Sequence, residues 1–280
     1  MSPYRAMDQR TLDAAYNNSA AVANSEDYLA DWRARSTAVR SRLPEHLDLA
    51  YGDKPATRLD FFSCGRPGAP TLLFFHGGYW QRNNKEGFAF VADGPLAHGF
   101  HVALAGYTLA PFARLDVIVG EVRSALRWLH SNVAKLGGDP CQIFLSGWSA
   151  GGHLAAMLMD EPAARGGIAI SGLYDLEPIR HSYLNEKLQL DEAEARRNSP
   201  LLHLPAQAGM LVIAVGTEEL PELQRQSTDF AAAWRDHGLD CELRGLPGCH
   251  HYAALEQLAS PEGELALALE KLPTGARVRG

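Results

Sequence analysis

The chain alternates between continuous apolar runs of strand length and segments whose apolar residues recur at helical spacing. The apolar runs occupy 71–75, 102–107, 143–147, 167–172 and 211–216, and a further strand is expected at 241–246. The helical segments between and after these runs are 86–98, 118–136, 154–160 and 222–237. Runs that are apolar at every position are typical of strands covered on both faces. The alternation therefore predicts an α/β fold with a mostly parallel, twisted sheet and helices on both faces.

The residues before this alternation carry two helical segments and two short extended runs. The helical segments are 8–17 and 23–42, and the extended runs are 47–51 and 58–63, which would add a mixed edge to the sheet. Because single α/β domains often exceed about 250 residues, we expect one domain over 1–280. Its helical N-terminal segment, 1–45, is expected to pack on or near the functional site.

One connection is too long for the alternation. Residues 173–209 separate two expected strands and contain a charged helical piece at 185–197. Ordinary connections in compact domains are short, and long ones are often functional. We expect an insertion over the carboxyl edge of the sheet that acts partly as a lid. The alternative is a longer surface helix with no role at the site.

Composition and charge exclude several classes of protein. The chain has 280 residues, of which 46% are hydrophobic and 21% charged, the balance of a globular protein with a full core. Its net charge of −7 disfavours a nucleic-acid surface, which is normally basic. No segment reaches the ~18 consecutive apolar residues of a membrane helix, and the polar N-terminus is unlike a secretory signal. The four cysteines are scattered without metal-ligand spacing, so we expect a reduced, cytoplasmic protein with no metal.

A candidate nucleophile lies in the strongest motif of the chain. Residues 147–151 read Gly-Trp-Ser-Ala-Gly, directly after an apolar strand and directly before an apolar helical segment. In this strand–turn–helix setting, G-x-S-x-G presents its serine on a sharp turn at the edge of a sheet. The turn is so tight that side chains at the two glycines would collide with neighbouring backbone. We therefore predict that Ser149 is the nucleophile of an acyl-transfer reaction.

A glycine pair after the first central strand predicts an oxyanion hole. Acyl transfer creates a negative oxygen, which needs hydrogen-bond donors already in place. The run 71–75 leads into His-Gly-Gly-Tyr-Trp, and glycines let the backbone aim its N–H groups at a ligand. The predicted donors are the amides of Gly77, Gly78 and Ala150, the last being the residue after the nucleophile. Tyr79 is a substitute donor.

Aromatic and histidine side chains beside these motifs have a functional and a structural interpretation. Tyr79, Trp80 and Trp148 are candidates for the substrate pocket, although Trp80 is equally well explained as core packing. His76 is expected to hold its loop by hydrogen bonding rather than to act as a base. His153, one turn into the helix after the nucleophile, is also expected to be structural.

A serine nucleophile needs a histidine base, and the histidine needs a carboxylate that orients it. In chains with this serine motif, the acid and then the histidine follow later in the sequence. The acid should lie just beyond strand 211–216, where Glu218 and Glu219 are both candidates. The histidine should follow strand 241–246, where His250 and His251 are both candidates. Motif order alone does not choose within either pair.

Five motifs together resemble the kynurenine formamidase (arylformamidase) branch of the α/β-hydrolases. They are HGGYW (76–80), GWSAGGH (147–153), SGLYDL (171–176), ELPELQRQS (219–227) and HHY (250–252). The resemblance covers about residues 71–256 and implies the α/β-hydrolase fold with a small lid. In that family the acid stands two residues before the proline of a P-E-x-x-R-Q run, and the histidine precedes an aromatic residue. The resemblance therefore implies Glu219, at a position that is often Asp in the family, and His251.

The resemblance implies a Ser-His-Glu hydrolase that removes a formyl or short acyl group from an aryl amide or ester. Its most specific form is an arylformamidase of tryptophan catabolism, which converts N-formylkynurenine to kynurenine and formate. No lysine or arginine for the amino-acid carboxylate of that substrate stands out. The alternative is a short-acyl carboxylesterase of broad specificity. A non-catalytic binding protein would lack a triad member, and all three positions are filled. We expect no cofactor, a small-molecule substrate, and no nucleic-acid or membrane partner; a homodimer is one option for assembly.

Overall fold

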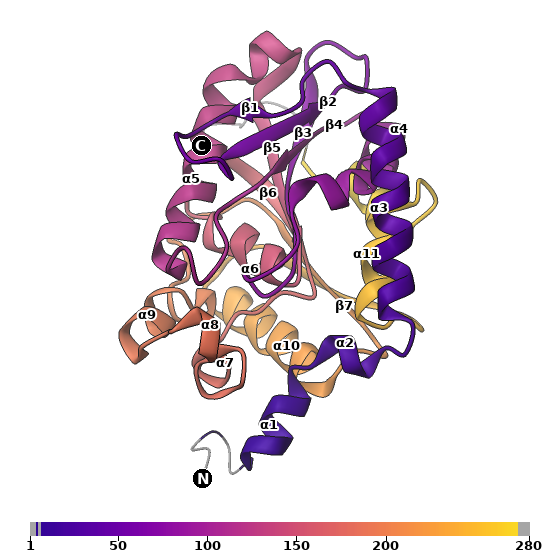
Figure 1. The fold of residues 1–280 in the computed structure, drawn as a ribbon. Coiled ribbons are helices and arrows are strands. Elements are labelled where there is room, and N and C mark those ends of the chain that lie inside the picture. The colour runs from indigo at the N-terminus through magenta and orange to yellow at the C-terminus, as the bar shows by residue number, and fades with distance from the viewer. Residues whose placement is uncertain (1–3, 5–6, 274–280) are drawn as a thin grey trace.

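The computed structural model describes residue 4 and residues 7–273, which form a layered α/β structure around a mixed sheet (Figure 1). Within these residues the sheet has eight strands in the order β1-β2-β4-β3-β5-β6-β7-β8. β2 pairs antiparallel with β1 and β4, and the remaining neighbours are parallel. The strands are β1 Leu49–Ala50, β2 Arg58–Phe62, β3 Ala69–Phe75, β4 His101–Ala105, β5 Gly138–Trp148, β6 Ala164–Ile170, β7 Leu211–Gly216 and β8 Cys241–Leu246. The predicted mostly parallel sheet with a mixed edge is confirmed.

Helices cover both faces of this sheet (Figure 1). The α-helices are α1 Gln9–Ala15, α2 Asn18–Ala21, α3 Ser25–Arg42, α4 Asp93–Ala97, α5 Leu115–Asn132, α6 Ala150–Met157, α7 Glu177–His181, α8 Asn185–Leu188, α9 Glu192–Arg197, α10 Pro221–Asp236, α11 His251–Ala259 and α12 Glu264–Ala268. Short 3₁₀ helices are η1 Lys85–Ala92, η2 Val133–Leu136, η3 Pro200–Leu202 and η4 Leu269–Lys271. No helix in the described part of the chain combines the length and apolarity needed to cross a lipid bilayer. The parts of the expected 1–280 domain and 1–45 segment that fall on residues 1–3, 5–6 and 274–280 lie outside the described residues.

Two predicted helices are divided in the structure. Segment 86–98 is a 3₁₀ helix followed by α4, because Pro95 lacks an N–H and fits only the first turn of a new helix. Segment 185–197 is broken where Gln189 takes a φ of 53°. The Asn185 side chain closes this turn on the backbone of Leu190, and Asp191 then caps α9 by accepting from the Glu194 amide.

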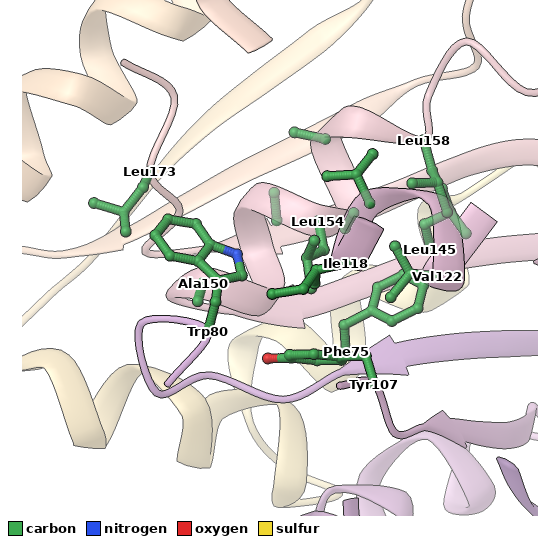
Figure 2. Packing of buried hydrophobic residues seen from close by; sticks show 14 of the residues in the cluster. Phe75, Trp80, Tyr107, Ile118, Val122, Leu145, Ala150, Leu154, Leu158 and Leu173 are labelled. Carbon is green, nitrogen blue, oxygen red and sulfur yellow. The ribbon is translucent and has the colours of Figure 1, made fainter. Parts of the chain in front are cut away.

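The central strands are almost entirely apolar because their alternate side chains enter two different cores. Phe75 of β3 points toward α5 and α6, where it meets Ile118 and Leu154 (Figure 2), and Leu73 belongs to the same core. Neighbouring side chains of the same strand, such as Phe74, point to the other face and join the core under α3, η1 and α11. Successive residues of a strand face opposite sides of a sheet, so each must be buried when both sides are covered. A polar side chain at one of these positions needs a hydrogen-bond partner, because an unpaired polar group in either core is costly.

The parallel strands end at a common edge, and the candidate residues follow those ends. The chain passes from β3 into the loop at His76, from β5 into Ser149, and from β7 into the turn that holds Glu219. β8 leads into a turn that ends at His251, the first residue of α11. Carboxyl ends of parallel strands meet at one edge of a sheet, which is where ligands bind in α/β folds. Positions that are far apart in sequence are thereby brought to one place.

The N-terminal helices are anchored to the rest of the fold at two points. Tyr16, just after α1, is fully buried and donates its hydroxyl proton to Glu222 Oε2 at 2.8 Å. Trp32 of α3 is also fully buried, and its indole N–H donates to Glu256 of α11. The short helix α2 lies between these anchors and is therefore held over the carboxyl edge of the sheet (Figure 1).

Candidate active site

Ser149 stands on a sharp turn between β5 and α6. Its backbone has φ 59° and ψ −119°, a sparsely populated conformation that is costly for a residue other than glycine. The turn is fixed by a hydrogen bond from the Ser149 amide to the Ile170 carbonyl, at 2.8 Å. A Cβ atom at Gly151 would lie 1.9 Å from the Phe75 carbonyl oxygen, so only glycine fits there. This is the strand–turn–helix geometry that the sequence motif predicted.

His251 and Glu219 form a direct hydrogen-bonded pair. Nδ1 of His251 lies 2.6 Å from Oε2 of Glu219, and both residues are buried. The other carboxylate oxygen of Glu219 accepts from the Ser171 hydroxyl at 2.5 Å and from the Gly216 amide at 2.8 Å. With both oxygens held, the carboxylate keeps the imidazole in one orientation and fixes the proton on Nδ1. Nε2 is then left as a proton acceptor beside the cavity that contains Ser149.

The structure separates the members of both ambiguous pairs. Glu218 is exposed, while Glu219 turns inward and binds the histidine. His250 precedes α11 and accepts a hydrogen bond from the Ala253 amide through Nδ1, so it serves as the N-cap of that helix. His251, the next residue, faces the carboxylate. Glu219 reaches His251 from a short turn after β7.

Trp148 positions His251 from the other side. Its indole N–H donates to the His251 carbonyl oxygen at 2.9 Å, and the two ring centroids are 4.6 Å apart. Trp148 also lines the cavity that contains Ser149. The imidazole is thus held by a carboxylate at Nδ1 and by an aromatic ring against its face, which leaves it little rotational freedom.

The glycine loop after β3 leaves its amides free. Gly78 has a φ of 121°, and a Cβ there would lie 2.4 Å from the Arg82 carbonyl oxygen. The loop is braced by the Asn83 side chain, which donates to the Gly77 carbonyl at 3.1 Å. Within residues 7–273, no acceptor is found for the backbone N–H groups of Gly77, Gly78 or Ala150. Free amides on two adjoining turns are what an oxyanion hole requires.

His76 and His153 have the structural roles expected of them. His76 is buried, stacks on Tyr107 with ring centroids 4.3 Å apart, and contacts the Gly77 carbonyl through Nδ1 at 2.9 Å. His153 is buried, and its Nε2 lies 2.7 Å from the Asn198 carbonyl oxygen. Burial lowers the pKa of each to about 4, because desolvation disfavours the imidazolium. Both are therefore neutral at pH 7, and His153 ties the 173–209 insertion to α6.

The structure corrects the expectation that Trp80 lines the substrate pocket. Its indole is fully buried, packs against Ala150 and Leu173 (Figure 2), and meets His153 edge-on with centroids 4.8 Å apart. It does not line the cavity, so of its two interpretations the core one holds. Tyr79 does line the cavity, but its hydroxyl is already engaged and donates to the Tyr16 carbonyl at 2.6 Å. Only its backbone amide is left as a substitute oxyanion donor.

The cavity beside Ser149 has a volume of about 40 Å³. Its wall is formed by the glycine loop, the serine and histidine turns and the N-terminal segment, and none of its lining residues comes from 173–209. Several lining residues were not singled out from the sequence, among them Arg82 and Asn18. Arg82 is the second residue after the HGGYW motif, and Asn18 lies in α2. No local pattern marks either residue as functional, because each reaches the site through the tertiary fold.

The described residues hold no group of three or more His, Cys, Asp or Glu side chains arranged to bind a metal ion. The chemistry that the site can carry out with its own residues is nucleophilic. It combines a serine on a strained turn, a histidine oriented by a carboxylate, and free amides beside them.

The chain is similar to known hydrolases over most of its length. The BD-FAE family matches residues 63–163. A kynurenine formamidase of Danio rerio is 29% identical over 97% of this chain and 99% of its own length. A kynurenine formamidase of Salmo salar is 34% identical over 81% of each chain. Among solved structures, a candidate thioesterase of a Silicibacter species is 30% identical, with a TM-score of 0.82 over 92% of this chain and 98% of that one.

These similarities agree with the fold and with the position of the motifs. The parallel sheet, its helical layers and the serine turn after β5 are those of an α/β-hydrolase, and the relatives are formamidases and esterases. The chain is therefore a hydrolase of this type. With a relative that is 34% identical over 81% of both sequences, the chain belongs to the kynurenine formamidase family of the α/β-hydrolases.

Proposed function

We propose that this enzyme hydrolyses the formyl amide of an aryl amine, and that its substrate is N-formylkynurenine, which it converts to kynurenine and formate. The observation that carries the proposal is the Glu219–His251 pair at 2.6 Å, buried beside Ser149 in a small cavity. The name of the relatives, kynurenine formamidase, supports the choice of substrate. The reaction would belong to tryptophan catabolism, for which we propose a cytoplasmic location.

Each group in the site has a defined role in the reaction, and His251 acts in turn as base and as acid. His251 Nε2 takes the proton of the Ser149 hydroxyl as the oxygen attacks the formyl carbon. The negative oxygen that forms is held by the amides of Gly77, Gly78 and Ala150. His251 then gives its proton to the leaving amine, and Glu219 stabilises the imidazolium in between. Water, activated by the same histidine, attacks the formyl ester on Ser149 and releases formate.

The size of the cavity favours a small acyl group. A volume of about 40 Å³ holds roughly three water molecules on a scale where one needs about 10–15 Å³. A formyl group, which has two heavy atoms, fits in this space beside Ser149.

The position of Arg82 supports a substrate whose leaving group is an amino acid. It lines the cavity, and within the described chain its guanidinium has no carboxylate partner at ion-pair distance. Kynurenine carries an α-carboxylate, and a guanidinium binds a carboxylate through two parallel hydrogen bonds. We propose that Arg82 binds this carboxylate and so orients the formyl group toward Ser149.

The competing function is that of a short-acyl carboxylesterase. The two functions differ in the leaving group, because an amine must be protonated as it departs and a phenolate need not be. The test compares kcat/KM for N-formylkynurenine with kcat/KM for p-nitrophenyl acetate. Turnover of N-formylkynurenine with a KM well below the KM for formanilide, a formamide that lacks the carboxylate, supports the proposal. Hydrolysis of the ester without measurable hydrolysis of either formamide would make the enzyme an esterase.

A further inference from the structure

Asn18 belongs to the short helix α2, yet its side chain lies against His251. Its amide nitrogen is 3.1 Å from the Tyr79 hydroxyl and 3.4 Å from Nε2 of His251. Only 4% of the residue is exposed, and it lines the same cavity as Ser149. Because Nε2 delivers its proton to the leaving group, Asn18 borders the position that the leaving atom of a substrate must occupy.

The orientation of this side-chain amide is set by its neighbours. The Tyr79 hydroxyl donates its own proton to the Tyr16 carbonyl at 2.6 Å, so its oxygen can only accept a further hydrogen bond. The group facing Tyr79 must therefore be the NH₂ of Asn18. The amide oxygen, Oδ1, then points away from Tyr79, and it is buried without a hydrogen-bond partner among the described residues. A buried acceptor without a donor is costly, and at a binding site it indicates a donor that arrives with the ligand.

We propose that Oδ1 of Asn18 accepts the N–H of the scissile amide, and that Asn18 thereby selects amides over esters. The inference rests on the proposed function. An aryl formamide carries one hydrogen on its leaving nitrogen, beside His251, where it completes the hydrogen bonding of Oδ1. The corresponding oxygen of an ester has no hydrogen and leaves Oδ1 unpaired. Sites built to bond a substrate N–H discriminate strongly against analogues that lack it.

The test uses formanilide and phenyl formate, which share the formyl group and the phenyl ring. The atom that links the two groups is an N–H in formanilide and an oxygen in phenyl formate. Asn18→Ala is expected to lower kcat/KM for formanilide at least tenfold and to change kcat/KM for phenyl formate less than threefold. The ester also controls for the loss of the contact between Asn18 and His251, which would affect both substrates alike.

The neighbouring Asn17 provides a matched control. It caps α2 by accepting from the Ala20 amide, and it does not line the cavity. Asn17→Ala should therefore leave the amide-to-ester ratio of kcat/KM unchanged. Equal losses for both substrates in Asn18→Ala, or no loss for either, would overturn the inference while the proposed function stands. A wild-type enzyme that hydrolyses phenyl formate but neither formanilide nor N-formylkynurenine would overturn the proposed function and the inference with it.

Discussion

Acid should destabilise this protein through two histidines that are buried in the neutral form. The pKa of His76 and that of His153 are both lowered by burial from 6.5 to about 4. In the unfolded chain each takes up a proton near pH 6.5, whereas in the folded chain each does so only near pH 4. Between these values the unfolded state binds more protons, so their contribution to stability is complete above pH 6.5 and is lost as the pH falls toward 4.

The magnitude follows from the two pKa values. Each histidine lowers the free energy of unfolding by ~1.4 kcal/mol for every pH unit within this range. From pH 6.5 to about 4 this amounts to about 3–4 kcal/mol per histidine, or about 7 kcal/mol for both. That is comparable to the whole stability of a typical domain, about 5–15 kcal/mol.

The assay is urea unfolding followed by circular dichroism at several values of pH between 4.5 and 7.5. His153→Gln keeps an N–H donor for the Asn198 carbonyl but does not titrate, so the slope of unfolding free energy against pH should fall by ~1.4 kcal/mol per pH unit. The same substitution at the exposed His130 should leave the slope as in wild type. An identical slope for His153→Gln and wild type would show that His153 does not contribute to the pH dependence of stability.

Three further predictions concern the site. Glu219→Gln should lower kcat about 10³–10⁴-fold, because the amide no longer fixes the correct imidazole tautomer, while the exposed Glu218→Gln should change it less than threefold; the opposite order in steady-state kinetics would mean that Glu218 is the acid. Ser171→Ala removes one hydrogen bond to a buried carboxylate, so it should lower the free energy of unfolding by about 1.5–3 kcal/mol and kcat about tenfold with KM unchanged; a change confined to KM would count against this role. Arg82→Gln should raise KM for N-formylkynurenine about tenfold and leave KM for formanilide within twofold, and equal changes for the two substrates would exclude carboxylate binding.

The sheet and the nucleophile turn could be predicted because their signals are local. A central strand such as β7 is apolar at all six positions, and burial on two faces is what that pattern requires. The serine turn is marked by glycines that the backbone cannot do without, as the 1.9 Å approach at Gly151 demonstrates. The acid and the base were narrowed to two neighbouring pairs by chain order alone. Which member points inward depends on turn geometry, and here the resemblance to a family chose Glu219 and His251.

The remaining site residues could not be predicted because their contacts are long-range. Asn18 meets His251 across more than 200 positions of sequence, and no spacing rule connects a short N-terminal helix to a later turn. Ser171 directly follows β6 and reaches Glu219 only because β6 and β7 are neighbours in the sheet. Trp80 was expected at the site and lies elsewhere. An aromatic residue after a glycine loop suggests a pocket wall, but the Trp80 side chain fills the core.

The central claim is that Ser149 attacks the formyl carbon with His251 as its base. The most direct measurement is formate release from N-formylkynurenine by wild type and by Ser149→Ala, at equal folded concentration. The variant loses only a hydroxyl from a residue that donates no side-chain hydrogen bond within the described structure, so it should fold as wild type does. The account predicts that kcat falls by at least ~10⁴-fold. Retention of near wild-type turnover by the variant would remove Ser149 from the reaction and contradict the account.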